Sequence, residues 1–275
     1  MKYRDLTILI NTFRSSDKIF KCLNSINKKY KVIVIENSND KNFKKSLEKK
    51  YKNVKCFLTN QNLGYAKGNN FGLKLVKTKY CLILNPDAVL KKNSLKNFEK
   101  FSKEYKDFSI VGPFDGSHMS DDKKKPYEVD AVKGFAMFVK MKDLKQINFF
   151  DKNFFIYCEE IDLCKRIKNN NKKVFIDPRI NIGHLGGSSH NKSIDYEMEL
   201  SRNWHWMWSQ FYFNKKHNGY FYSLFKFFPK LLYSFLKSFL FLILFNKKKF
   251  KIYFHRFLGL YYSIICRGSF YRPKV

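Results

Sequence analysis

The sequence predicts an α/β fold, with a mostly parallel central sheet flanked by helices and followed by an amphipathic helical tail. Three observations favour it. Short apolar runs alternate with segments of helical spacing, as in βαβ units. Polar residues close these runs abruptly, as they do at strand ends. Positions 200–275 contain 14 basic residues and no acid, which sets them apart from the preceding chain.

The elements follow from the periodicity of the apolar residues. Runs that are apolar at every position are typical of strands buried on both faces, whereas spacings of three and four residues indicate helices. A loop rich in Gly, Ser, Asp and Lys, residues 112–126, is the best candidate for a mobile segment. The predicted strands are residues 6–10, 32–35, 54–59, 80–84 and 174–177, with further strands over 129–140 that run through 134–139. The predicted helices are one after the loop 11–17, with Ile19, Leu23 and Ile26 at helical spacing, and 42–52, 66–76, 93–104 and 160–167.

Charge and cysteine content narrow the class of protein. The net charge is +31, but only eight of the 54 basic residues are Arg, the residue favoured for phosphate forks and base edges. We therefore expect an anionic surface as a partner and no nucleic acid. Six cysteines without a CxxC pair indicate reduced, mostly buried thiols. The first apolar stretch, residues 6–10, is too short for a signal core, so the globular part of the chain is expected to face the cytosol.

The chain is predicted to divide into a globular domain, residues 1–215, and a basic aromatic tail, residues 216–275. On a helix over 226–248, Lys226, Lys230, Lys237 and Lys248 would lie within roughly 40° of one another. The uncharged runs of the tail are shorter than the ~20 residues that a spanning helix needs. A helix lying on an anionic membrane surface is predicted, and a core helix of a C-terminal subdomain is the alternative.

Asp87 closes the apolar run 80–84 in the frame Leu-Asn-Pro-Asp. The carboxyl end of a central parallel strand is where open α/β sheets bind ligands. A carboxylate there suits a divalent cation that neutralises a diphosphate. A turn aspartate is the alternative reading, and the polar clusters described next weigh against it.

Two further strand ends carry polar side chains that are expected at the same edge. Glu36 and Asn37 follow the second strand, and Thr12 follows the first. A carboxylate at such a position commonly contacts a ribose hydroxyl or a base. A turn stabilised by the Asn side chain explains Glu36 and Asn37 equally well.

The segment 62–72 is unusually rich in Gly and Asn for a strand–helix loop. Gly64 and Gly68 would allow a ligand to approach the backbone closely, and Asn70 could bond a nucleobase or ribose. The spacing does not match the dinucleotide fingerprint.

Acidic residues also cluster at the predicted start of the helix over 160–167. The helix dipole favours an ionised carboxylate there, which suits a general base, and Glu160 and Asp162 are the candidates. Capping accounts for one or two of the acids in this cluster. His184, in a glycine-lined loop, is a candidate ligand for the metal or the diphosphate.

In this order, the motifs resemble those of family 2 glycosyltransferases with the GT-A fold, and more narrowly the rhamnosyltransferase type. The likeness covers about residues 5–205 and comprises the early strand and loop, the Asn/Gly segment 62–72, Leu-Asn-Pro-Asp, the acidic helix start and the His184 loop. It implies inverting transfer of a rhamnose-like sugar from a nucleoside-diphosphate donor to a hydroxyl of a cell-surface polysaccharide or lipid-linked acceptor. It also implies a divalent metal cofactor, Mg²⁺ or Mn²⁺. The resemblance further implies that the protein is located at the cytoplasmic face of the cell membrane.

The resemblance assigns roles by position. Asp87 would be the metal ligand with His184 close by, and Glu160 the base. The chain departs from the family in having Glu at 36 and 160 where Asp is usual, which leaves Asp162 as an alternative base. The donor-binding residues that the resemblance implies are Thr12, Glu36, Asn37, Asn62, Gly64, Asn70 and Asp87.

Two other functions stay open for the chain. One is a non-catalytic membrane- or polyanion-binding protein on a degenerate scaffold, and the other is a nucleotidyltransferase.

Overall fold

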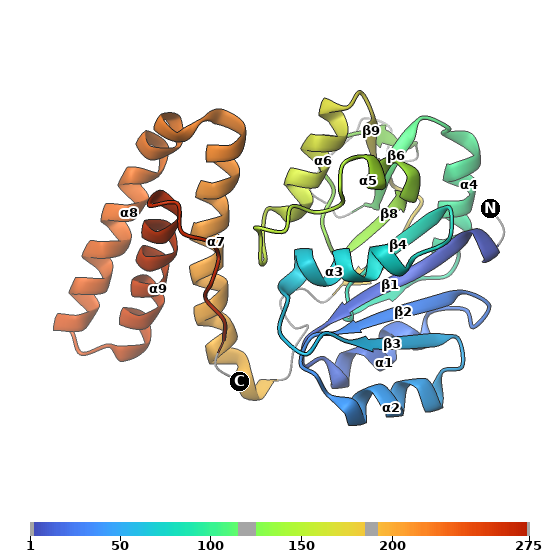
Figure 1. Cartoon of the computed structure of the whole chain (residues 1–275), viewed down its shortest axis with the longest axis horizontal. Coiled ribbons are helices and arrows are strands. Elements are labelled where there is room, and N and C mark those ends of the chain that lie inside the picture. The colour runs from blue at the N-terminus through green and yellow to red at the C-terminus, as the bar shows by residue number, and fades with distance from the viewer. Residues whose placement is uncertain (1–2, 115–124, 185–191, 274–275) are drawn as a thin grey trace. The chain divides into compact units, whose positions relative to one another are not determined.

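The computed structural model describes residues 3–114, 125–184 and 192–273, and these residues form two compact units (Figure 1). The first unit consists of the chain up to Asp151 and from Glu160 to residue 191, and the second of Lys152–Glu159 with everything from Lys192 onward. Most of the predicted mobile loop and the glycine-rich stretch after His184 lie outside the described residues.

The elements alternate through the first unit much as the periodicity predicts. The strands are β1 (Leu6–Thr12), β2 (Lys31–Glu36), β3 (Val54–Leu58), β4 (Tyr80–Leu84), β5 (Ala88–Leu90), β6 (Phe108–Pro113), β7 (Tyr127–Glu128), β8 (Ala136–Lys140), β9 (Lys173–Asp177) and β10 (Ile182–His184). The helices before residue 192 are α1 (Ser16–Asn24), α2 (Lys41–Lys50), α3 (Gly64–Leu75), α4 (Ser94–Glu104), α5 (Met141–Gln146) and α6 (Glu159–Asn169). The second unit contains α7 (Asp195–Asn218), α8 (Tyr220–Ile243) and α9 (Lys247–Ile264).

In the described part of the chain, the main sheet has eight strands in the order β3-β2-β1-β4-β8-β6-β9-β7. Strands β3, β2, β1 and β4 run parallel, and β8 is antiparallel to both of its neighbours. Parallel pairing places Thr12 beside Glu36 at the carboxyl edge, and Leu84, which pairs with Ile10, is two residues short of it. The α/β fold predicted from the sequence is confirmed, and its carboxyl edge gathers the predicted strand ends.

Helices pack on both faces of this sheet because successive side chains of a buried strand point to opposite faces. On one face, Ile8 and Ile10 of β1 join a core with side chains of α1, α2 and α4. On the other face, α3 approaches so closely that a Cβ atom on Gly72 would lie 2.2 Å from the Leu9 side chain. The six cysteines, all among the described residues, form no disulfide, and all except Cys266 are buried. Burial raises the pKa of Cys56 to about 12.

A small second sheet joins distant parts of the first unit. β5 pairs antiparallel with β10, which places Ala88 opposite His184. The amide N–H of Asn85 also donates to the carbonyl of Phe135, just before β8. These pairings fix the segment 85–88 between β4, β8 and β10.

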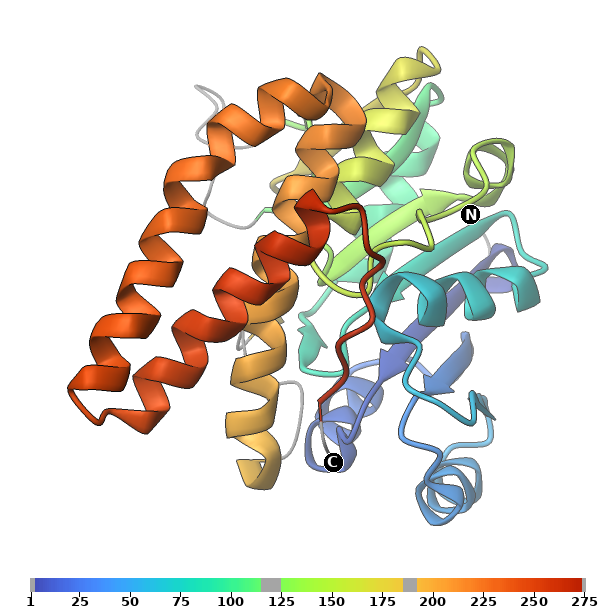
Figure 2. The same ribbon diagram turned by 60° about the vertical axis from the view of Figure 1, so that its left-hand side comes forward.

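The second unit is built from α7, α8 and α9, and Figure 2 shows α8 and α9 side by side. α9 crosses α7 closely, because a Cβ atom on Gly259 would lie 2.1 Å from the carbonyl oxygen of Trp204. The chain after α9 runs back along α7, where His205 bonds the carbonyl of Tyr271 and Trp208 donates to that of Arg267. Residues 192–215 therefore belong with the helical unit, whereas the sequence placed them in the globular domain.

The predicted single helix over 226–248 is wrong in one respect. α8 ends at Ile243, and the chain turns through Phe245, whose φ is 51°, before α9 begins. Lys248 is on α9 and does not extend the row of lysines on α8. Lys226 and Lys230 donate to Asn214 and Gln210 of α7, so these two lysines line the α7 side of α8.

Candidate active site

Asp87 and His184 lie together in the first unit. The pairing of β5 with β10 brings the imidazole Nε2 of His184 to 3.4 Å from Oδ1 of Asp87. The Phe135 ring stacks on the His184 ring, with centroids 4.5 Å apart and planes 9° from parallel. The structure thus brings together two residues that are almost a hundred positions apart and that the sequence predicted as metal ligands.

The Asp87 carboxylate is buried, with its side chain 1% exposed, and neither of its oxygens accepts a hydrogen bond from any described residue. Burying a carboxylate without such partners costs several kcal/mol. Carboxylate oxygen and imidazole nitrogen are suitable ligands for Mn²⁺ or Mg²⁺, so the two side chains fit a divalent cation. Among the described residues no third His, Cys, Asp or Glu joins them.

Glu160, on α6, lies close to the short segment Gly134–Phe135, which also contacts His184. Gly134 approaches Glu160 so closely that its Cβ atom would be 3.6 Å from that of the glutamate. Its carbonyl also accepts a hydrogen bond from the Tyr65 hydroxyl. Because Phe135 is the next residue and stacks on His184, one short stretch of chain connects the surroundings of Glu160 and of Asp87.

The two candidate bases differ in their surroundings. Burial raises the pKa of Glu160, against hydrogen bonds from its own backbone N–H and that of Ile161. Asp162 is fully buried and forms an ion pair with Arg166, whose Nε lies 2.7 Å from its Oδ2. Among the described residues, Asp162 thus forms an ion pair with Arg166, whereas Glu160 forms none.

A pocket of ≈ 280 Å³ lies at the carboxyl ends of β1 and β2. Glu36 lines it, but its carboxylate also accepts hydrogen bonds from the amides of Ser38 and Asp40 and thereby shapes the loop after β2. Asp40 in turn caps α2 by accepting from the amide of Phe43. The other lining residues are Arg14, Ser15, Ser16, Ser38 and Phe43.

The predicted donor-binding residues around the start of α3 bond mainly to one another and to the backbone. The Thr12 hydroxyl donates to the carbonyl of Ile35. The Asn37 amide donates to Asn11 and accepts from the amide of Leu63. Asn62 accepts from the amide of Gly64, whose φ of 73° favours glycine. These contacts brace the carboxyl edge of the sheet.

Asn70 and Gly68 also make internal contacts. The Asn70 side chain forms two hydrogen bonds with the backbone of Phe150, donating to its carbonyl at 2.8 Å and accepting from its amide at 3.0 Å. A Cβ atom on Gly68 would lie 2.6 Å from the Asn11 side chain. Asn11 fills the space beside Gly68, whereas the sequence predicted that a ligand would approach the backbone there.

Sequence reasoning missed several residues of the site. Asn11 donates to the carbonyls of Gly64 and Tyr65 and so joins β1 to α3. Arg14 lines the pocket, and Phe135 packs on His184. A polar residue inside the first apolar strand was the available signal for Asn11, whereas nothing local distinguishes Arg14 or Phe135 from the residues around them.

The fold, with a buried carboxylate at the carboxyl edge of its parallel strands, is that of the GT-A glycosyltransferases. The family model for glycosyl transferase family 2 matches residues 7–177, and the chain belongs to this family. The enzyme class predicted from the sequence is thereby confirmed, which weighs against the nucleotidyltransferase alternative.

Two curated relatives are glycosyltransferases. Rhamnosyltransferase WbbL of Escherichia coli is 29% identical over 188 residues, which cover 54% of this chain and 70% of that protein. The low-salt glycan biosynthesis hexosyltransferase Agl10 of Haloferax volcanii is 23% identical over 222 residues, covering 70% of this chain and 68% of that protein.

Solved structures share the fold, and one of them matches over most of its length. The mannosyltransferase PcManGT of Pyrobaculum calidifontis, solved with GDP-Man and Mn²⁺, superposes with a TM-score of 0.60. It is 11% identical, and the match covers 94% of this chain and 87% of that one.

Proposed function

We propose that the chain is an inverting glycosyltransferase that moves a rhamnose-like hexose from a nucleoside diphosphate to a hydroxyl of a saccharide acceptor. The observation that carries this proposal is Asp87, a buried carboxylate without a described hydrogen-bond partner, 3.4 Å from His184 at the edge where α/β sheets bind ligands. The similarity to rhamnosyltransferase WbbL supports the choice of sugar.

The donor would extend along the carboxyl edge of the sheet. Its base and ribose would occupy the pocket between Arg14 and Glu36, and its diphosphate would lie towards Asp87. β2, β1 and β4 are neighbours in the sheet, and two inter-strand spacings amount to about 10 Å. A ribose and a diphosphate can cover that span. Thr12, Asn37, Asn62, Gly64 and Asn70 would hold this edge in shape through the hydrogen bonds described above.

Asp87 and His184 would hold a divalent cation, which when bound neutralises charge that develops on the departing diphosphate. Such cations usually keep water and phosphate ligands, so two protein ligands can suffice. The PcManGT structure with Mn²⁺ supports a metal in a protein of this fold.

Glu160 would act as the general base. It would take the proton of the acceptor hydroxyl as the hydroxyl oxygen attacks the anomeric carbon and the diphosphate leaves from the opposite face. A raised pKa makes Glu160 a stronger proton acceptor once it is ionised. The ion pair of Asp162 with Arg166 supports the choice of Glu160 over Asp162.

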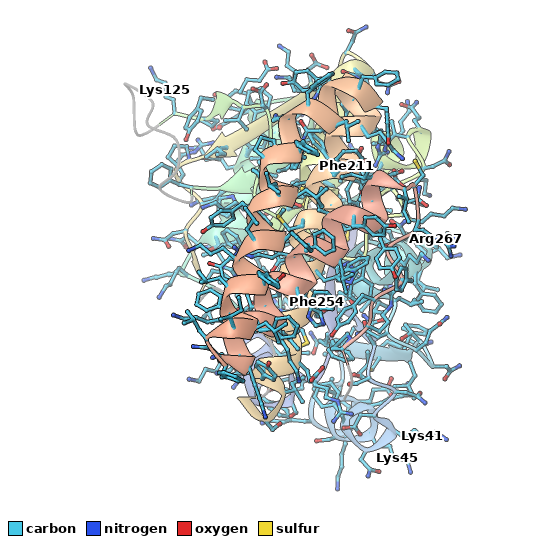
Figure 3. All side chains as sticks on the ribbon, turned by 90° about the vertical axis from the view of Figure 1, so that its left-hand side faces the viewer. Lys41, Lys45, Lys125, Phe211, Phe254 and Arg267 are labelled. Atoms are coloured by element: carbon cyan, nitrogen blue, oxygen red, sulfur yellow. The ribbon has the colours of Figure 1, made fainter. Side chains whose placement is uncertain are left out.

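We also place the enzyme on an anionic membrane surface, at its cytoplasmic face. No helix in the described residues is long and apolar enough to span a bilayer. α8 nevertheless exposes large apolar side chains along its length, and Figure 3 looks onto α8 and α9. Four lysines, 247, 248, 249 and 251, follow at the start of α9 and complement anionic headgroups. The most exposed apolar residues of α8 are Phe221, Phe225, Phe228, Phe239 and Ile243.

The test of this function is a panel of nucleoside-diphosphate sugars, which includes TDP-rhamnose and UDP- and GDP-hexoses. Binding by calorimetry and slow donor hydrolysis with Mn²⁺ are measured on the full chain. We expect one donor of the panel to bind and to be hydrolysed. Absence of binding across the panel would contradict the proposal.

A further inference from the structure

A second pocket, of ≈ 310 Å³, lies within the helical unit and plays no part in the chemistry described above. Two arginines, two aromatic residues and an asparagine line it, and none of these described residues is acidic. The lining residues are Tyr157, Arg202, Asn203, Trp206 and Arg256.

The Arg256 guanidinium is fixed in an orientation that suits an anion. Its Nε donates to Oδ1 of Asn203 at 2.6 Å, and Asn203 is itself fixed by donating to the carbonyl of Glu199. In the described part of the chain, Nη1 and Nη2 of Arg256 donate no hydrogen bond. The nearby Glu199 carboxylate is paired with Lys248. A half-buried guanidinium with two unused donors in a fixed plane fits a phosphate or carboxylate.

The aromatic residues provide an apolar wall. Trp206 is 44% exposed and meets the Tyr157 ring edge to face, with centroids 5.3 Å apart. The other two tryptophans of the chain, Trp204 and Trp208, are buried in the same helix. An exposed indole beside a pocket offers a flat surface on which the C–H face of a sugar ring can pack.

The backbone that presents Tyr157 is strained. Tyr157 and Cys158 have φ values of 73° and 66°, in the left-handed region that is costly for residues with side chains. Strain of this kind persists where the surrounding structure holds it and clusters at functional sites. Tyr157 also precedes Glu160 by only three residues, so their Cα atoms are at most about 11 Å apart.

We propose that this pocket binds the acceptor, and that the acceptor is a saccharide carrying a phosphate or diphosphate group. Arg256, with Arg202 beside it, takes the anionic group, and Trp206 and Tyr157 take the sugar ring. The inference rests on the proposed function, since only a transferase needs an acceptor. It adds the chemical class of that acceptor and the residues that recognise it.

The test is calorimetric titration of the full chain with glucose 1-phosphate, decyl glucosyl diphosphate, neutral decyl glucoside and inorganic pyrophosphate. Both phosphorylated sugars should bind at least about tenfold more tightly than the neutral glycoside, as expected for a charge-assisted fork. Tighter binding of the decyl diphosphate indicates a lipid-linked acceptor, and equal binding indicates a free saccharide phosphate.

Variants locate the binding. Arg256→Gln and Trp206→Ala should each weaken binding of glucose 1-phosphate by about tenfold, and Arg256→Lys should weaken it less. Matched controls are Arg267→Gln and Phe71→Ala, which alter an exposed arginine and an exposed aromatic residue outside the pocket and should leave affinity unchanged. Figure 3 labels Arg267 just beyond α9. Thermal unfolding by circular dichroism checks that each variant is folded.

Three results would overturn the proposal: no phosphorylated probe binds, affinity is unchanged in Arg256→Gln, or pyrophosphate binds as tightly as glucose 1-phosphate and Trp206→Ala has no effect. Nucleotide-sugar binding by the unaltered chain tests the proposed function separately. If that binding is present while the pocket variants behave like the controls, only the inference about the acceptor fails.

Discussion

Asp162 and Arg166 form a buried ion pair one helical turn apart on α6, with Nε and Oδ2 2.7 Å from each other. The other guanidinium nitrogens of Arg166 donate to the carbonyls of Ile147 and Phe149. The pair therefore connects α6 to the end of α5. Glu160, two residues earlier, has a different environment, and this difference separates the two candidate bases by experiment.

Glu160→Gln should lower turnover by about 100-fold or more while donor affinity stays the same, because the amide keeps the size of the side chain and cannot accept a proton. Asp162→Asn should instead lower the free energy of unfolding by about 3 kcal/mol, because it breaks a buried ion pair. Steady-state kinetics and urea unfolding measure the two effects. A stable Asp162→Asn variant without turnover, beside an active Glu160→Gln variant, would reverse the assignment.

The raised pKa of Glu160 has a consequence for pH dependence. The base works only when ionised, so the acid limb of kcat/KM should lie at a higher pH than the ordinary glutamate value of 4.5. Burial also makes the ionised form costly, so its contribution to stability falls as pH rises through the raised pKa. Glu160→Gln should therefore gain stability relative to the unaltered chain as pH rises above 4.5, the ordinary glutamate value. An acid limb at or below 4.5 would contradict this account.

The parallel strands could be predicted because their signal is local. β1, β2 and β4 are short runs buried on both faces, and polar residues such as Glu36 mark their ends. Parallel pairing then brings those ends to one edge without further information. The placement of Asp87 at that edge follows from the same rule.

The rest depends on contacts between distant residues. β5 and β10 are three residues each, too short for a period to show, and only their pairing puts His184 beside Asp87. The sequence predicts that the Asn70 amide binds a ligand. In the structure the side chain instead forms two hydrogen bonds with the backbone of Phe150, 80 residues later. The turn between α8 and α9 contains neither Gly nor Pro, so the two helices read as one.

Asp87→Asn should remove metal binding and leave the fold intact. Mn²⁺ should raise the melting temperature of the unaltered chain, because a cation that binds only the folded state stabilises it. The variant should lose that rise, and without metal it should be at least as stable, since a neutral amide is cheaper to bury than a carboxylate. Asp130→Asn is the control, because the Asp130 side chain is 97% exposed. An Mn²⁺-induced rise that persists in Asp87→Asn would exclude Asp87 as a ligand.

The apolar face of α8 predicts vesicle binding. Phe225 and Phe239 are 79% and 56% exposed, and replacing both with Ser should lower partitioning onto phosphatidylglycerol-containing vesicles by about tenfold or more. High salt should weaken binding further because the lysines at the start of α9 contribute electrostatically. Co-sedimentation measures the bound fraction. Phe71→Ser, which changes a similarly large side chain on α3, should bind as the unaltered chain does, and equal binding by the α8 variant would refute the membrane face.

The close crossing of α7 and α9 predicts that Gly259 tolerates no side chain. A Cβ atom there would lie 2.1 Å from the Trp204 carbonyl oxygen and 3.1 Å from the Trp204 Cα, and backbone atoms cannot rotate aside. Gly259→Ala should force the helices apart and lower the free energy of unfolding by about 1–3 kcal/mol. Gly268→Ala is the matched control, because its Cβ atom would meet nothing within 4 Å. All three tryptophans of the chain lie on α7, so their fluorescence during urea unfolding reports on this unit. Equal midpoints for the two variants would show that the helices do not depend on this contact.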